Sequence, residues 1–235
     1  MKFTISSILL IATLSLAALA QNSAKPWSEW DKKEVEKMLN TSAWGQTQSD
    51  TDTSNMMYQS STNNSGSSVG VTGAGASRQA MTTNYRVRLF SARPIREAFA
   101  RQVLFSNPNL KPTQLDGFLN GDYSEMIVVS VTWDGADQRY TAIIAKAFGT
   151  ATTETIRKKV YLERKDGKQI EITEYAQPSS DGTGAKFVFP RLLDGKPFVE
   201  AGDGTLRFYA DMGGGPVINW RFKLSDMNYN GKFEL

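Results

Sequence analysis

The chain has 235 residues and contains neither cysteine nor histidine. This composition excludes disulfides, metal sites built on Cys or His, and Ser-His or Cys-His catalysis, and we expect no cofactor. With 27 basic and 24 acidic residues the chain is nearly neutral, so its overall charge favours no polyanionic partner such as nucleic acid. Its 40% hydrophobic content is enough to build a folded core.

Residues 1–20 have the pattern of an export signal. The basic Lys2 precedes an apolar run over residues 5–17, and Ala18-Leu19-Ala20 supplies the small residues at which signal peptidase cleaves. A retained anchor is the alternative, but a spanning helix needs about 20 apolar residues. We therefore expect cleavage near Ala20/Gln21, a mature chain without a transmembrane segment, and a periplasmic or secreted protein.

A short amphipathic helix is predicted over residues 28–40, within an isolated N-terminal segment over residues 21–44. Ser28 and Asp31 fit the S-x-x-D pattern of a helix start. Three of the five tryptophans lie in or beside this helix: Trp27, Trp30 and Trp44. Two interpretations stay open. The rings either dock the helix on the chain's own main domain or form an exposed docking site for a partner.

Residues 45–83 are predicted to be a flexible, low-complexity tether. The stretch over residues 59–77 has no charge, no proline and no large apolar residue beyond two valines. Such a segment cannot bury enough surface to offset the entropy lost on ordering. A formal G-x-S-x-G motif over residues 66–70 falls inside the tether and has no His partner, so it is not a nucleophile elbow.

Residues 84–235 are predicted to form the main domain. Its first strand covers residues 85–92, which alternate apolar and basic side chains. Two short helices then follow, over 94–105 and 113–120, and Pro94 suits the first helical turn. Further strands are predicted over 127–133, 140–148, 206–212 and 218–224. The expected fold is mainly β (α+β): an antiparallel β-sandwich with two short helices inserted after its first strand.

Two turns are specific enough to predict strand register. A three-residue loop over residues 165–167 keeps apolar residues on one face and places Gly167 in the left-handed conformation. The same reasoning applies to the turn at Asn230-Gly231. The expected cross-strand pairs are Leu162 with Ile170 and Met227 with Phe233.

Five arginines close together in the sequence are the strongest local charge feature. They are Arg86, Arg88, Arg93, Arg96 and Arg101. They form either a patch that binds anionic polysaccharide, lipid headgroups or an acidic protein, or the solvated faces of a strand and a helix. Aromatic residues do not alternate with them as in nucleic-acid-binding surfaces.

Oxygen-based chemistry is still available to this chain. Asp-Gly sequences at Asp181, Asp194 and Asp203 resemble parts of calcium loops, but the spacing D-x-[DN]-x-[DN]-G is missing, and turns are the better interpretation. Paired carboxylates could hydrolyse glycosides without His or Cys. The candidates on predicted strands are Glu163, Glu171, Glu174 and Asp211.

The order of motifs carries a resemblance. The motifs are Trp27-Ser-Glu-Trp30, the run Glu34-Val-Glu-Lys-Met-Leu-Asn-Thr-Ser-Ala-Trp44, the polar tether and Val87-Arg-Leu-Phe-Ser-Ala-Arg-Pro-Ile-Arg96, with Phe222-Lys-Leu-Ser-Asp-Met227 as a less specific match. Together they resemble a group of uncharacterised secreted proteins from Gram-negative soil bacteria. The resemblance covers the N-terminal helix and the start of the main domain. It implies an architecture and supplies no catalytic residues.

The sequence as a whole favours a non-enzymatic protein of the cell envelope. We expect an exported binding or structural module whose partner is an envelope protein or a polysaccharide, and not nucleic acid. The alternative is a carbohydrate-active hydrolase that uses an Asp/Glu pair. Exposed tryptophans would favour partner docking, whereas burial of these rings would leave them a structural role.

Overall fold

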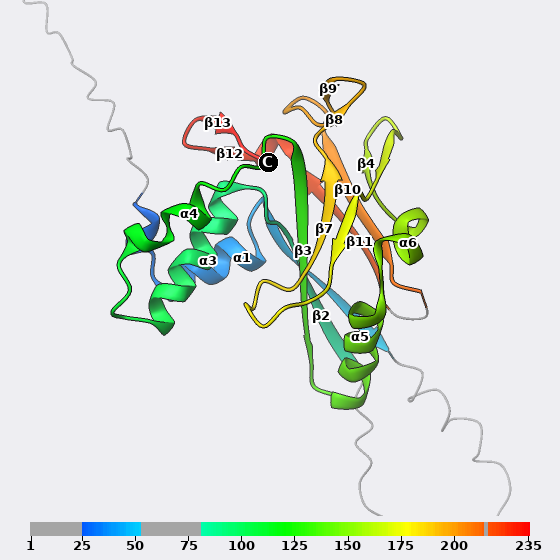
Figure 1. The fold of residues 1–235 in the computed structure, drawn as a ribbon, viewed down its shortest axis with the longest axis horizontal. Coiled ribbons are helices and arrows are strands. Elements are labelled where there is room, and N and C mark those ends of the chain that lie inside the picture. The colour runs from blue at the N-terminus through cyan, green and yellow to red at the C-terminus, as the bar shows by residue number, and fades with distance from the viewer. Residues whose placement is uncertain (1–24, 53–80, 214–215) are drawn as a thin grey trace, which may run out of the picture.

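The computed structural model describes residues 25–52, 81–213 and 216–235. Over these residues two antiparallel sheets pack face to face, and a group of helices lies on the outer side of the larger sheet (Figure 1). The predicted fold class, mainly β with antiparallel sheets and short helices, is confirmed. The expected leader over residues 1–20 and the central part of the expected tether lie outside the described residues.

The larger sheet, sheet A, has the strand order β1-β2-β3-β7-β6, and the smaller, sheet B, has the order β11-β10-β4-β5. Sheet A consists of β1 (Gly45–Asp52), β2 (Met81–Leu89), β3 (Met126–Gly135), β6 (Glu174–Ala176) and β7 (Ala185–Pro190). Sheet B consists of β4 (Val160–Arg164), β5 (Gln169–Glu171), β10 (Thr205–Asp211) and β11 (Val217–Lys223). Two small hairpins extend beyond the sheets: β8 (Leu192–Leu193) with β9 (Lys196–Pro197), and β12 (Asn228–Tyr229) with β13 (Lys232–Phe233).

The helices form two groups. The first, on the outer side of sheet A, consists of η1 (Trp27–Glu29), α1 (Lys32–Asn40), α3 (Arg93–Ser106), η2 (Pro112–Leu115) and α4 (Asp116–Leu119). The second joins β3 to β4 and consists of α5 (Gln138–Thr150), α6 (Thr153–Ile156) and η3 (Arg157–Lys159). A further turn, η4 (Leu224–Asp226), follows β11. The two helices predicted after the first strand of the main domain are present as α3 and η2–α4.

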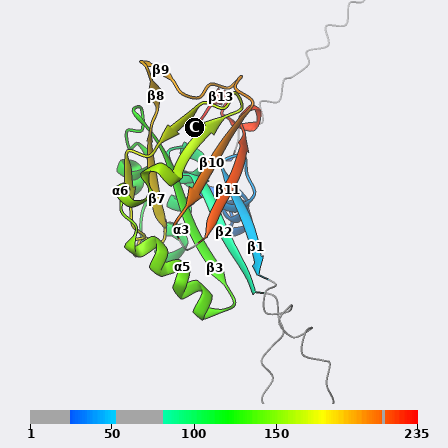
Figure 2. The ribbon, with the colours of Figure 1, turned by 90° about the vertical axis from the view of Figure 1, so that its right-hand side faces the viewer.

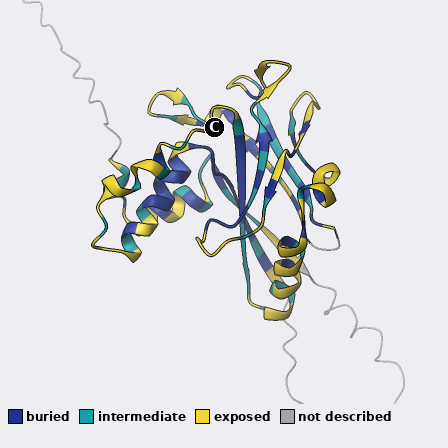
Figure 3. Cartoon of the chain, viewed as in Figure 1, coloured by how far each residue is buried: buried dark blue, intermediate teal, exposed yellow. Residues whose placement is uncertain are grey.

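Aromatic rings fill the space between the two sheets. The ring of Phe187 in sheet A lies 5.3 Å from that of Phe208 in sheet B, and Phe148 of α5 stacks on Trp133 at 4.5 Å. In β10 every second residue is buried, as the sequence alternation predicts. In β3 both faces are buried, Val128 included, because the helices cover its second face (Figure 3).

The side chain of Gln48 joins the edges of the two sheets. Its Nε2 donates to the carbonyl of Val217 (3.2 Å), and its Oε1 accepts from the N–H of Asn219 (2.9 Å). The amide thus takes the place of a neighbouring strand beside β11, which lies next to β1 in Figure 2. At the other end of the sheets the chain runs from β5 into β6, and the N–H of Thr173 donates to the carbonyl of Val188 (2.8 Å). The Gln48 side chain thus closes one open side of the sandwich, and the chain connection from β5 to β6 closes the other.

The predicted tether bounds of 45–83 need correction at both ends. Residues 45–52 form β1, which pairs with β2 from Gly45 opposite Arg88 to Asp52 opposite Met81. Alternation cannot predict β1, because its sequence, GQTQSDTD, has no apolar side chain and the strand is held by backbone hydrogen bonds. A glycine is needed at its start, since a Cβ on Gly45 would lie 2.5 Å from a carbonyl oxygen of α1.

The N-terminal helix begins later than predicted and is not isolated. Asp31, not Ser28, is the N-cap: its side chain accepts from the N–H of Glu34 (2.8 Å), and the Glu34 carboxylate accepts from the N–H of Asp31 (2.6 Å). Ser28 lies in η1 instead. The apolar face of α1 is buried against α3 and β2, so residues 25–52 belong to the same folded unit as the main domain.

Residues 140–148 form helix α5 and not the predicted strand. The carboxylate of Asp137 caps this helix by accepting from the N–H groups of Arg139 (2.8 Å) and Tyr140 (3.4 Å). Ile144 and Phe148, four residues apart, are its buried residues, which is the helical period. An apolar run of this length fits both periods, and the cap decides between them.

The first hairpin has the predicted register. Leu162 pairs with Ile170 across the loop over residues 165–167, and Gly167 has a φ of +84°. The left-handed conformation is open to glycine without steric cost, so the three-residue loop fits this sequence.

The second hairpin is shifted by one residue from the prediction. Asn228, and not Met227, pairs with Phe233. Asn230 and Gly231 both have positive φ values, 52° and 78°, which makes a two-residue turn of type I′. Asn tolerates the left-handed conformation, so no third loop residue is needed.

Candidate functional site

The tryptophans proposed for partner docking pack against the chain's own fold. Trp30 and Trp44 are buried, and their indole N–H groups donate to the carbonyls of Lys25 (3.1 Å) and Glu234 (2.7 Å). Trp27 is partly buried against the same core. Because both buried rings have satisfied N–H groups, they anchor α1 to the domain and do not offer a free docking surface.

Two of the five clustered arginines are buried. Arg88 is 5% exposed and donates to the carbonyl of Leu39 (2.8 Å), to Asn40 Oδ1 (3.0 Å) and to Thr132 Oγ1 (2.9 Å). Burial lowers its pKa to about 10, so the guanidinium stays charged at neutral pH and holds the C-terminal end of α1. Arg96 is 6% exposed and lies over the ring of Tyr123 at 4.4 Å.

The other three arginines have separate partners in the fold. Arg86 forms an ion pair with Asp134, and Arg93 pairs with Glu97 (2.8 Å). Arg101 donates to the carbonyl of Trp30 (2.7 Å). The five guanidinium groups therefore do not meet on one exposed surface, because two are buried and the other three are bound to separate partners in the fold.

The Asp-Gly sequences form turns. Gly182 and Gly184 follow Asp181 with φ values of 75° and 85°, and Asp194 itself has a φ of 53°. Asp203 accepts from the N–H of Glu200 (2.8 Å) within its own loop. Among the residues that the structure describes, no three acidic side chains come together as ligands for a metal ion.

The four carboxylates considered for hydrolysis lie on different strands. Glu171 pairs with Lys158 (2.7 Å), and Asp211 accepts from the N–H of Gly213 (2.8 Å) in a turn. Glu174 is exposed on β6 in the other sheet. Hydrogen bonds from Gln169 and Arg207 lower the pKa of Glu163, although burial opposes them. A general acid needs a raised pKa, so this environment does not suit the hydrolase alternative.

A groove of about 520 Å³ lies between α3, the η2–α4 segment and the loop that precedes β7. Its apolar wall consists of Phe99, Ala100, Val103, Leu115 and Phe118, and its polar rim of Gln102, Ser106, Asn107, Asp181 and Thr183. The volume lies within the range of small-ligand pockets, about 300–1,000 Å³. Its lining suits an apolar ligand.

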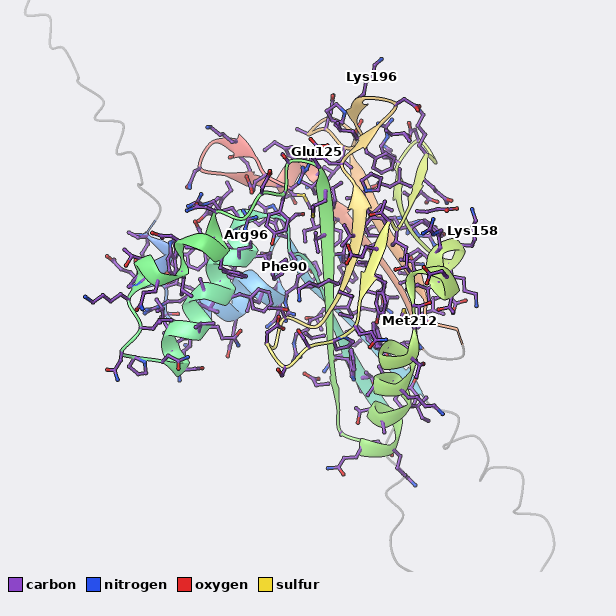
Figure 4. The ribbon with its side chains drawn as sticks, in the orientation of Figure 1. Phe90, Arg96, Glu125, Lys158, Lys196 and Met212 are labelled. Carbon is purple, nitrogen blue, oxygen red and sulfur yellow. The ribbon has the colours of Figure 1, made fainter. Side chains whose placement is uncertain are left out.

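Packed aromatic rings support the groove from the domain side. Phe90, at the end of β2, lies 5.8 Å from Phe99 and 5.9 Å from Phe118, ring to ring. Figure 4 labels Phe90, between sheet A and the helices, and Arg96, on α3. The wall of the groove is therefore fixed by the same contacts that hold α3 and α4 on the sheet.

Asp181 gives one end of the groove a negative charge. Burial alone would raise its pKa, but hydrogen bonds from the hydroxyl (2.7 Å) and N–H (2.9 Å) of Thr183 and the nearby Lys186 lower the pKa to about 2. Gly184 holds this loop close to the sheet, because a Cβ at that position would lie 2.2 Å from the carbonyl of Val131. The groove thus combines an apolar wall with an acidic rim.

The groove was not predictable as a site, but one residue carries a signal of it. The helix period places Val103 on the same face as Ile95 and Phe99, which predicts burial. Val103 is instead 39% exposed, because it lines the groove. An apolar helix face that continues beyond the elements available to cover it is therefore the signal in the sequence.

Comparison of the chain with protein-family models, with curated proteins and with solved structures finds no match. The resemblance to secreted proteins of soil bacteria accordingly stays a prediction. Within the described ranges, no helix is long and apolar enough to cross a membrane.

Proposed function

We propose that this protein is an exported, non-enzymatic binding module of the cell envelope, and that its ligand site is the groove beside α3. The observation that carries the proposal is the groove itself, with five apolar lining residues and an ionised carboxylate at its rim. A pocket of this size with few polar groups is the usual form of a binding site for a small ligand.

The chemistry of the groove indicates the kind of ligand. Phe99, Val103 and Phe118 offer apolar surface to a ligand of matching shape. Asp181 stays ionised across the physiological pH range. Its Oδ2 pairs with Lys186 (3.4 Å), and the carboxylate would accept a further hydrogen bond from a donor or cationic group of a ligand. We therefore propose a ligand with an apolar body and one donor or cationic group. Export is supported by the basic and apolar pattern of residues 1–20.

The test begins with expression of the complete chain in a Gram-negative host. The protein should be recovered from the periplasm or the medium, and its mass should match a chain that begins at Gln21. The recovered protein is then titrated with the fluorescent apolar probe N-phenylnaphthylamine. Val103→Asp should weaken probe binding on the order of tenfold, since it places a second negative charge against the apolar wall.

Ile143→Asp is the matched control, because Ile143 is 55% exposed on α5, away from the groove. It introduces the same charge on another helix and should leave probe binding unchanged. Equal effects of the two substitutions would contradict the groove as the binding site. Recovery of the chain in the cytoplasm with residues 1–20 still attached would contradict export.

A further inference from the structure

The outer face of sheet B carries two rows of side chains that take no part in the hydrophobic core and that no helix in the described part of the chain covers. Strand pairing places one residue of each of the four strands in each row. The polar row is Gln169, Glu163, Arg207 and Arg221, and the aromatic row is Glu171, Tyr161, Tyr209 and Asn219. The face lies on the side of the molecule away from α1 and α3 (Figures 1 and 2). All eight residues are exposed or partly exposed.

Hydrogen bonds across the strands fix the polar row. Arg207 donates from Nε to Asn219 Oδ1 (2.8 Å) and from Nη1 to Glu163 Oε1 (3.3 Å), and Gln169 donates to the other oxygen of Glu163. Among the described residues Arg221 has no such bond, whereas Gln169, Glu163 and Arg207 are held before any ligand arrives. A ligand would therefore lose little binding free energy to ordering them.

Ring stacking and a neighbouring guanidinium fix the two tyrosines of the aromatic row. The rings of Tyr161 and Tyr209 stack at 5.0 Å with an angle of 19° between their planes. The Arg207 guanidinium lies 5.2 Å from the Tyr209 ring and 5.8 Å from the Tyr161 ring. Two rings stacked on each other stand up from the exposed sheet face, so they offer their apolar edges and their hydroxyls to solvent beside fixed polar groups.

Much of the hydrogen-bonding capacity of this face is unused. Within the described part of the chain, neither tyrosine hydroxyl has a partner, and neither does the guanidinium of Arg221. The Asn219 amide nitrogen and the Gln169 amide oxygen are likewise free. Neighbouring side chains of a row lie about 5 Å apart across the strands, so the free donors and acceptors are closely spaced. A ligand that offers many hydroxyls, each both donor and acceptor, would match this surface.

The charges on the face favour a neutral ligand. The outward-facing charged residues of the four strands are Glu163, Glu171 and Asp211 against Arg207, Arg221 and Lys223. Lys158, at the border of the face, pairs with Glu171 (2.7 Å), so acids and bases nearly balance. A nucleic acid needs an excess of positive charge. A protein partner needs an apolar centre, and Val217 is the exposed large apolar residue among the described parts of these strands.

We propose that the outer face of sheet B binds a neutral polysaccharide, whose rings contact the exposed edges of Tyr161 and Tyr209 while its hydroxyls bond the free polar groups of this face. The four strands span about 14 Å across a row, enough for a short run of sugar rings. This site is separate from the groove beside α3. Its failure would leave the groove proposal standing, and the reverse also holds.

The test is affinity electrophoresis of the mature protein in gels that contain a soluble neutral β-glucan, xylan or galactomannan, with alginate as the acidic probe. At least one neutral polysaccharide should retard the protein. Tyr209→Ala should weaken the interaction on the order of tenfold, and Arg221→Ala a few-fold. Thermal unfolding of each variant checks that it is folded. If Tyr209→Ala does not fold, Asn219→Ala and Arg221→Ala test the proposal, because both side chains are exposed. Each should then be retarded less by the neutral polysaccharide than the unchanged protein.

Two matched controls locate the effect. Arg139→Ala removes an exposed arginine of α5, and Val103→Asp alters the groove; both should migrate like the unchanged protein. The proposal is overturned if no neutral polysaccharide retards the protein, or if Tyr209→Ala folds and is retarded as strongly as the unchanged protein. Retardation by alginate alone, lost at roughly 0.5 M salt, would also overturn it, because screening by salt marks a purely electrostatic contact.

Discussion

Arg88, on the helix-covered face of sheet A, is almost fully buried, and its three hydrogen bonds end on α1 and β3. Arg207, on the open face of sheet B, also bonds its neighbours, but it forms part of a solvent-facing row. Tyrosine divides in the same way between Tyr175, buried beneath α5, and Tyr209, stacked on the surface. The same residue types hold the fold together in one region and remain available to a ligand in the other.

The difference teaches that arginine density in the sequence is a poor guide to a basic surface. The region richest in arginine, residues 86–101, uses its guanidinium groups to satisfy carbonyls and carboxylates of the fold. What decides the role of an arginine is whether helices cover the face of the sheet from which it projects. Substitutions at Arg88, Tyr175 and Gln48, with Arg221→Ala as a matched control, test this comparison.

The largest effect is expected for Arg88→Ala. It leaves the carbonyl of Leu39 and the Asn40 side chain without their donor and opens a void between α1 and sheet A. We expect a loss of about 3–5 kcal/mol in the free energy of unfolding. Arg221→Ala, the matched change on the open face, should alter stability by less than about 0.5 kcal/mol. Urea denaturation measures both, and similar values for the two variants would contradict the comparison.

A smaller effect concerns Tyr175 at alkaline pH. Its hydroxyl donates to the carbonyl of Phe148 (2.7 Å), and burial raises its pKa well above 10. In the unfolded chain the phenol ionises near pH 10, whereas in the folded chain it stays protonated, so stability is lost as pH rises above 10. The contribution of this group to the slope is about 1.4 kcal/mol per pH unit.

Tyr175→Phe should remove that part of the slope. Urea denaturation from pH 8 to pH 11 compares the variant with the unchanged chain, so that titration of the lysines cancels. At pH 8 the variant should be less stable by about 1 kcal/mol, the value of the lost hydrogen bond. Parallel stability curves above pH 10 would show that the hydroxyl of Tyr175 is accessible to water.

The smallest effect is expected where the two sheets meet, at Gln48. Gln48→Ala removes both bonds to the backbone of β11 and should cost about 1 kcal/mol. Amide hydrogen exchange at Asn219 should accelerate more than exchange in β10. Gln48→Glu keeps the acceptor for the Asn219 N–H and loses the donor to Val217, so it should protect the Asn219 amide partly. Unchanged exchange in both variants would mean that Gln48 does not close the sandwich.

Much of the β-fold could be predicted because one side of most strands faces a common core. Alternation in β10 predicts its buried residues, and Gly167 predicts the register of Leu162 with Ile170. Prediction fails where a segment has no apolar side chains, or where its apolar side chains fit both the strand period and the helix period. β1 is entirely polar, and residues 140–148 fit a strand as well as a helix until the cap at Asp137 is considered.

The candidate sites were harder to predict than the fold. The groove combines α3, α4 and a loop some 80 residues further along the chain, and Val103 was its one local signal. The face of sheet B combines strands from residues 160 to 223, and only their pairing brings Tyr161 beside Tyr209. Long-range pairing of this kind leaves no local pattern.

The sequence by itself determined the class of fold, the excluded chemistry and the helices after the first predicted strand, because composition, period and capping act locally. Tertiary structure alone decided what the clustered residues do. It buried Trp30, Trp44, Arg88 and Arg96 within the fold, and it left Tyr161 and Tyr209 on an open face. The physical reason is that burial depends on which element covers a face, and that element lies far away in the chain.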